Sequence, residues 1–183
     1  MNNLTVFTGP MKCGKTTKLI EEYNKWKHSD KKVAMFKPSV DNRFCEDKVI
    51  SRNNTEIICY NINSTKDLIM YIDKADIFFI DEFQFLNGEV IDLVKLISKG
   101  KQFFISGLNL TSDRKPFGLM NDLLCFADEI ILCKAICENC KEYNATYTYC
   151  KVSKTNDILV GDDVYSPVCC QCYDILKDKE TYK

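Results

Sequence analysis

The chain has 183 residues, of which 45% are hydrophobic and 28% charged, and its 25 basic side chains nearly balance 26 acidic ones. This composition excludes a disordered or low-complexity chain, and a formal net charge of -1 provides no basic surface for nucleic acid. No apolar run approaches the roughly 20 residues that cross a bilayer, and the N-terminus lacks the segments of a signal peptide. We therefore expect a soluble, cytoplasmic protein that binds neither nucleic acid nor membrane.

Short apolar strands alternate with helical segments along the first 133 residues. Helices are predicted at 15–27, 65–73, 88–99 and 117–127 and a polar loop at 41–54, while strands are predicted at 4–8, 32–37, 56–60, 75–80, 101–106 and 129–133. The run Ala75–Ile80 is apolar without alternation, which is typical of a strand buried on both faces of a parallel sheet. This pattern predicts an α/β fold, with a parallel sheet flanked by helices.

The sequence changes character near Lys134. Residues 134–183 show no helical periodicity, and they contain two cysteine pairs and many tyrosines. We therefore predict a boundary that separates an α/β domain, 1–133, from a small C-terminal domain, 134–183.

A phosphate-binding loop follows the first predicted strand. Residues 9–16 match the G-x-x-x-x-G-K-[S/T] pattern in full and lie between a strand and a helix, as the motif requires. Backbone N–H groups of such a loop surround a phosphate chain, with Lys15 at the β- and γ-phosphates of ATP and the Thr16 hydroxyl on Mg²⁺. The fold is therefore of the P-loop NTPase type, with these predicted phosphate-binding residues: Gly9, Pro10, Met11, Lys12, Cys13, Gly14, Lys15 and Thr16.

Lys12 and Cys13 occupy positions of the loop that tolerate many residues. Lys12 is either a solvated charge or a source of positive potential at the phosphates. The Cys13 thiol lies close to a helix N-terminus, which can lower a thiol pKa. We expect alkylation or oxidation of Cys13 to block nucleotide binding.

Two carboxylates end the buried strand at 75–80. Asp81 is placed to bind Mg²⁺, as in a Walker B element. Glu82 follows on the same edge, where it would act as a general base toward a hydroxyl acceptor or activate a water molecule.

The C-terminal cysteine pairs have the spacing of a zinc site. Cys137 and Cys140 form one C-x-x-C pair, and Cys169 and Cys172 form another after a gap of 28 residues. Four thiolates in this arrangement suit a closed, structural Zn²⁺ site, with Cys170 as a bystander. A redox-active C-x-x-C is the alternative, and we expect the six scattered cysteines to be reduced and buried.

Together these motifs resemble the type II thymidine kinases, the zinc-containing P-loop deoxynucleoside kinases. The resemblance covers about residues 3 to 173 and is carried by the phosphate loop, the segments 41–43, 80–85 and 107–118, and the two cysteine pairs. It implies Mg²⁺-dependent transfer of phosphate from ATP to thymidine, or to deoxyuridine, giving dTMP for DNA precursor synthesis, with Glu82 as general base. It also implies a homotetramer, feedback inhibition by dTTP, and a loop in the zinc domain that covers the nucleoside.

The resemblance assigns further residues position by position. Asp41, Arg43 and Gln84 match positions on the ATP side of the site, and Gln84 with Phe85 flanks the nucleoside pocket. The predicted nucleoside-binding residues are Met11, Phe85, Ser112, Phe117, Asn156, Ile158, Val160 and Tyr165. Ser112 stands where an aromatic residue is common, so an altered nucleoside preference is one expectation.

Two other functions fit parts of the sequence. A nucleoside monophosphate kinase would also carry a phosphate loop, but its usual G-x-P-G-x-G-K form is absent. A nucleotide-dependent switch would use the zinc domain to bind a partner, and it would hydrolyse ATP slowly without a nucleoside acceptor.

Overall fold

The computed structural model describes residues 3–40, 48–50, 56–152 and 163–181. A six-stranded sheet in the order β5-β2-β6-β7-β1-β8 forms its centre. Every pair of neighbouring strands in this sheet is parallel. The strands are β1 (Leu4–Thr8), β2 (Val33–Pro38), β5 (Tyr60–Ile62), β6 (Ile77–Ile80), β7 (Gln102–Gly107) and β8 (Glu129–Leu132). The predicted α/β fold with a parallel sheet is confirmed.

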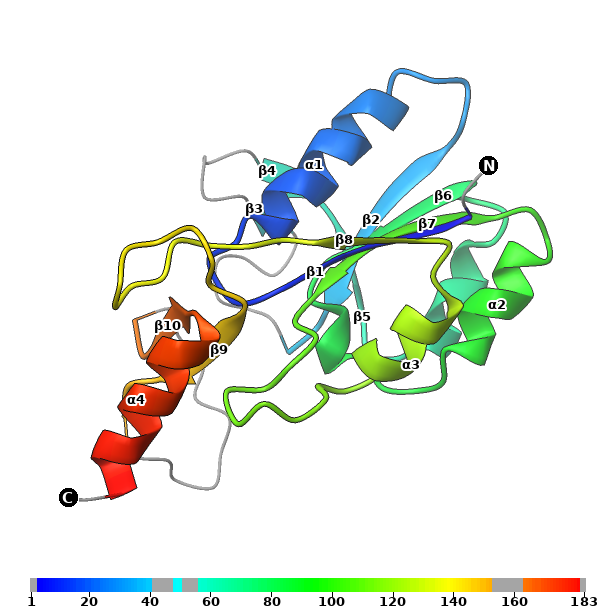
Figure 1. The fold of residues 1–183 in the computed structure, drawn as a ribbon. Helices are drawn as coiled ribbons and strands as arrows, with labels where there is room; N and C mark the ends of the chain where they lie inside the picture. Colours follow the sequence, from blue (N-terminus) through cyan, green and yellow to red (C-terminus); the bar gives the residue numbers. More distant parts are fainter. Residues whose placement is uncertain (1–2, 41–47, 51–55, 153–162, 182–183) are drawn as a thin grey trace.

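Helices cover both faces of the sheet (Figure 1). On one face, α1 (Lys15–Trp26) packs Leu19 and Ile20 against Phe79 and its neighbours. On the other face lie α2 (Ile91–Ile97), α3 (Met120–Phe126) and a 3-10 helix, η1 (Thr65–Tyr71). Aromatic side chains stack across adjacent strands, such as Phe78 on Phe103 with ring centroids 5.0 Å apart. Because β6 is buried along its whole length, the residues that follow it have a fixed position at the C-terminal end of the parallel strands.

The region predicted as loop and strand at 41–60 is divided differently. β3 (Lys48–Ile50) and β4 (Glu56–Ile58) form a separate antiparallel pair, and the chain re-enters the main sheet as β5. The predicted strand at 56–60 therefore belongs to two sheets. Cys59 lies between the two strands and is buried in the same cluster as Ile57. Because the apolar character continues through Cys59, the sequence does not show where one strand ends and the next begins.

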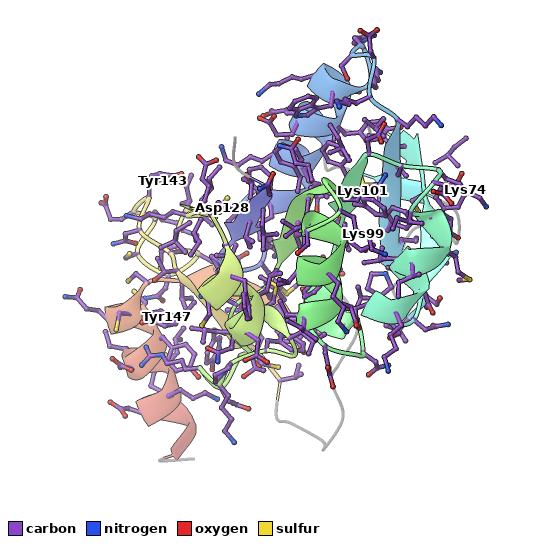
Figure 2. All side chains as sticks on the ribbon, turned by 90° about the vertical axis from the view of Figure 1, so that its right-hand side faces the viewer. Lys74, Lys99, Lys101, Asp128, Tyr143 and Tyr147 are labelled. Atoms are coloured by element: carbon purple, nitrogen blue, oxygen red, sulfur yellow. The ribbon has the colours of Figure 1, made fainter. Side chains whose placement is uncertain are left out.

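A small C-terminal lobe, which we define as residues 134–152 and 163–181, lies at one end of the sheet (Figure 1). It contains β9 (Tyr147–Cys150), the antiparallel β10 (Tyr165–Val168) and α4 (Cys170–Thr181). Tyr143 and Tyr147 of the lobe lie across the molecule from Lys74 and Lys99 (Figure 2). The sequence shows no helical periodicity in this region, and α4 forms nonetheless, because it buries Cys172 and Tyr173 in place of a regular aliphatic stripe. None of the helices in the described residues has the length and apolar character needed to cross a membrane.

Candidate active site and metal centre

The phosphate loop joins the C-terminal end of β1 to the start of α1. Gly9 and Gly14 have φ values of 142° and 82°, a backbone region that favours glycine. A Cβ on Gly9 would lie 2.3 Å from the Cys133 carbonyl oxygen, so no side chain fits there. The buried Lys15 amine folds back over the loop, 2.7 Å from the Pro10 carbonyl oxygen and 3.6 Å from the Cys13 sulfur. A phosphate chain would compete with these two groups for the Lys15 ammonium.

The C-terminal lobe contacts the phosphate loop directly. The Met11 backbone N–H donates to the Thr148 hydroxyl at 3.0 Å, and the Lys12 amine pairs with the Glu138 carboxylate at 2.9 Å. Burial would raise the pKa of Glu138, but hydrogen bonds from Ser166, Lys12 and Lys151 outweigh it and lower that pKa to about 2. Glu138 therefore stays ionised. The sequence predicts that Lys12 is either a solvated charge or a source of positive potential at the phosphates, and in the structure its amine pairs with Glu138 of the lobe.

Asp81 meets the phosphate loop at the C-terminal edge of the sheet. The Thr16 hydroxyl donates to the buried Asp81 carboxylate at 3.0 Å, so the structure brings the two predicted Mg²⁺ ligands together. A hydroxyl and a carboxylate oxygen are ligands that Mg²⁺ accepts, and the residues present therefore fit that ion. The Ser106 hydroxyl also donates to Asp81. Sequence reasoning missed Ser106, although a polar residue near the end of the apolar strand β7 was a usable signal.

Glu82 sits in an unusual backbone conformation. Its φ of 52° is in the left-handed region, which residues other than glycine rarely adopt. The Gln84 amide N–H donates to the Glu82 carboxylate, and the Gln84 amide oxygen accepts from the Leu108 N–H at 3.0 Å. Gln84 thus links Glu82 to the loop after β7. Backbone strain of this kind often marks a functional position.

Two of the predicted nucleoside-binding residues pack against each other. The rings of Phe85 and Phe117 meet edge to face, with centroids 5.4 Å apart. Ser112 contacts the lobe, since its carbonyl accepts from the Tyr173 hydroxyl at 2.6 Å. Tyr165 is part of the lobe and begins β10. Five predicted site residues lie outside the described residues: Asp41, Arg43, Asn156, Ile158 and Val160.

The four predicted zinc ligands form one cluster. The sulfur atoms of Cys137, Cys140, Cys169 and Cys172 all lie within 4.8 Å of one another, and those of Cys140 and Cys169 are 3.9 Å apart. Thiolates bound tetrahedrally to zinc at about 2.3 Å lie about 3.8 Å apart, so this cluster fits a zinc ion. Burial opposes ionisation of Cys137, but backbone N–H groups of residues 139, 140 and 169 outweigh it and lower the pKa of this thiol to about 6.

The remaining cysteines lie outside this cluster. Cys170 is exposed at the start of α4 and is not among the clustered sulfurs, as predicted. Of the scattered cysteines, Cys125 is exposed on α3, contrary to expectation, and Cys45 lies outside the described residues. The others are buried: Cys13, Cys59, Cys133 and Cys150.

Comparison with known proteins places nearly the whole chain in one family. Residues 2–173 match the family model described as thymidine kinase. A thymidine kinase from Pseudothermotoga lettingae is 36% identical over 96% of this chain and 97% of its own length. Those from Bacteroides thetaiotaomicron and Mesomycoplasma hyopneumoniae are 32% and 33% identical over 93% and 94% of this chain, and 86% and 95% of their own lengths. The chain therefore belongs to the thymidine kinase family of enzymes.

Proposed function

We propose that this chain transfers the γ-phosphoryl group of Mg-ATP to the 5′-hydroxyl of thymidine, with deoxyuridine as an alternative acceptor, and so supplies dTMP for DNA precursor synthesis. The observation that carries the proposal is the meeting of three groups at one edge of the sheet: the phosphate loop, the Asp81–Thr16 pair and the Glu82–Gln84 pair. Ligands of parallel α/β sheets bind at this edge. Family membership supplies the acceptor.

Each group has a distinct task in this proposal. The loop N–H groups and Lys15 hold the β- and γ-phosphates, while Thr16 and Asp81 would hold Mg²⁺, which offsets charge on the transferring phosphoryl group when bound. Glu82 accepts the proton of the 5′-hydroxyl as that oxygen attacks phosphorus in line with the leaving oxygen. Gln84 orients the Glu82 carboxylate, and Phe85 and Phe117 form an apolar wall for the base.

The C-terminal cluster has a structural role in this proposal. Cys137, Cys140, Cys169 and Cys172 would hold Zn²⁺ and fix the lobe against the phosphate loop through the Lys12–Glu138 ion pair. The lobe also carries the predicted nucleoside-binding Tyr165.

Glu82→Gln tests the proposed base. ADP release from Mg-ATP is measured with thymidine, deoxyuridine, deoxycytidine, thymidine monophosphate and no acceptor. We expect thymidine-dependent turnover, and a loss of about 10²–10⁴-fold in kcat in the variant with little change in thymidine affinity, since an amide cannot accept the proton.

Glu89→Gln is the matched control, because it makes the same change at an exposed carboxylate. Its turnover should equal that of the parent protein. Turnover with the monophosphate alone, or ATP hydrolysis that no acceptor accelerates, would contradict the proposal and favour a monophosphate kinase or a nucleotide-dependent switch.

We further propose that the enzyme is a cytoplasmic homotetramer inhibited by dTTP. Apolar side chains on and near the edge strand β8 support self-association: Phe126, Ile130 and Leu132 are each at least 50% exposed. Ten free cysteines in the described residues suit a reducing compartment. Inhibition by dTTP follows if its base and sugar occupy the nucleoside site while its phosphates reach the loop.

A further inference from the structure

Two cysteines outside the zinc cluster meet at the phosphate loop. Cys13 lies in the loop, and Cys133 follows β8, where its backbone N–H donates to the Thr8 carbonyl oxygen at 2.7 Å. Gly9 lies between them: a Cβ there would be 2.3 Å from the Cys133 carbonyl oxygen and 3.1 Å from the Cys13 sulfur. The two cysteines are 9% and 4% exposed and belong to the same packed cluster.

The surroundings of the pair favour one thiolate and one protonated thiol. The Lys15 ammonium lies 3.6 Å from the Cys13 sulfur. A hydrogen bond from Cys133 and the Lys15 charge lower the pKa of Cys13 against the opposing effect of burial. The same hydrogen bond, together with burial, raises the pKa of Cys133. A thiolate is the nucleophilic form of cysteine, so Cys13 is the reactive member of the pair.

An open hollow borders the residue that carries the reactive sulfur. It has a volume of about 550 Å³, lies between the phosphate loop and the C-terminal lobe, and is lined by Cys13 together with Gly14, Lys134 and Tyr143. Peroxides are far smaller than this hollow, so a peroxide molecule can enter it and approach Cys13, which is mostly buried.

We propose that Cys13 and Cys133 form a redox-active pair that a peroxide oxidises to a disulfide, switching off nucleotide binding. The Cys13 thiolate attacks one peroxide oxygen, the O–O bond breaks, and the departing hydroxide takes a proton to become water. The Cys133 sulfur then attacks the Cys13 sulfenic acid; the S–O bond breaks, and hydroxide leaves as water with the Cys133 proton. In sum, two thiols and one hydrogen peroxide give one disulfide and two waters.

The disulfide would act on the loop that holds ATP. A disulfide draws its sulfurs to about 2.05 Å, so Cys13 is pinned to the chain beyond β8 and leaves Lys15. A loop fixed in this way cannot adjust its N–H groups to the phosphates. Conversely, bound Mg-ATP draws the Lys15 ammonium toward phosphate and away from Cys13, so nucleotide protects the thiol. The consequence for ATP rests on the proposed function, whereas formation of the disulfide does not.

The test uses the full-length, zinc-loaded protein and equimolar hydrogen peroxide. Peptide mapping without reductant should find a 13–133 disulfide, formed more slowly with Mg-ATP present, while the zinc content stays constant. Titration calorimetry should show at least a tenfold loss of Mg-ATP affinity that dithiothreitol restores. No 13–133 disulfide, or zinc release at the same rate as inactivation, would overturn the proposal.

Variants separate the pair from the other thiols. Cys133→Ser should keep the basal Mg-ATP affinity and form no disulfide at Cys13, and dimedone should label the sulfenic acid there; Cys133→Ala serves if Ser destabilises the fold. Cys125→Ser, which removes an exposed thiol, should form the 13–133 disulfide at the parental rate. If peroxide lowered the Mg-ATP affinity of Cys133→Ser as much as that of the parent protein, and dithiothreitol restored it, the proposed pairing of Cys13 with Cys133 would be overturned. Because mapping reads the disulfide itself, a protein without kinase activity would still report on it.

Discussion

Gly118 lies where the loop after β7 crosses the backbone of Gln84. Its φ is 53°, and a Cβ there would lie 2.1 Å from the Gln84 carbonyl oxygen. Gly118→Ala therefore combines left-handed strain with a backbone clash. We expect a loss of more than about 1 kcal/mol in unfolding free energy, and a rise in the thymidine KM because Phe117 is displaced from Phe85. Urea denaturation and steady-state kinetics measure the two effects.

Gly100→Ala separates strain from clash. Gly100 also has a left-handed φ, 80°, but a Cβ there would meet nothing within 4 Å. This control should cost only the conformational strain and leave the thymidine KM unchanged. Equal effects of the two variants would show that the close contact between position 118 and the Gln84 backbone does not affect the unfolding free energy.

The residues of the site differ in how far sequence could predict them. The phosphate loop and Asp81 follow from local motifs, because each chemistry needs fixed residue types at fixed spacing. Ser106 and Thr148 were missed, since their partners lie far away in the sequence: Ser106 donates to Asp81, and Thr148 accepts from the Met11 N–H. Only the tertiary fold brings such groups together, through β6–β7 pairing for Ser106 and through packing of the lobe on the phosphate loop for Thr148.

At the scale of elements, Arg114 joins the loop after β7 to the C-terminal lobe. Its guanidinium carbon lies 4.3 Å and 3.9 Å from the ring centroids of Tyr147 and Tyr173. Its nitrogens contact the Asp174 carboxylate at 2.8 Å and the Cys170 carbonyl oxygen at 3.1 Å. In Figure 2, Tyr147 lies beside α4, the helix that carries the other three groups. Arg114 thus fixes α4 against the loop that carries Phe117.

Arg114→Ala should loosen this contact between elements. We expect a loss of about 1–3 kcal/mol in unfolding free energy from the lost stacking and charge-assisted hydrogen bonds. The thymidine KM should rise more than kcat falls, because Arg114 positions the loop without touching the phosphates. Calorimetric unfolding and kinetics measure both, with zinc content as a check on the metal centre.

Lys115→Ala is the matched control, since it removes the same charge from the neighbouring exposed position. Arg114→Lys keeps the charge but loses the planar fork, and it should fall between Ala and the parent protein. A Lys115 variant as impaired as Arg114→Ala would contradict the positioning role.

Helices and strands were predictable from sequence where their buried residues form a simple apolar pattern. Apart from β5, the strands of the main sheet have largely apolar sequences, and α1 has a regular apolar stripe, so sequence placed them to within a few residues. α4 was missed because its buried side chains are cysteine and tyrosine, and β3 because the segments on either side of it are polar. In both places long-range contacts decide the structure more than local propensity does.

At the scale of the whole molecule, the edge strand β8 bears on the proposed assembly. Ile130 and Leu132 are 50% and 53% exposed, and apolar side chains on an exposed sheet edge favour association. Ile130→Glu should convert the proposed tetramer to smaller species, because a charge would be buried at the interface. Light scattering coupled to size-exclusion chromatography reads the mass directly.

The control is Ile69→Glu in η1, near the opposite edge of the sheet. Ile69 is 51% exposed, so the same substitution there changes charge and hydropathy equally. It should leave the mass unchanged. A monomeric parent protein, or equal dissociation by both variants, would contradict an interface at β8.

The position of β1 inside the sheet has a consequence for the order in which the chain folds. Leu4 pairs with Phe103 and Thr5 with Glu129, so β1, which precedes the other strands of this sheet in the chain, has both of its neighbours among the last strands of the sheet. Until the ribosome has passed β7, the apolar segment Leu4–Thr8 has no strand to join, and such delayed long-range pairing slows folding. The phosphate loop, which β1 carries, therefore takes its final form only after β7, which ends at Gly107, has been synthesised.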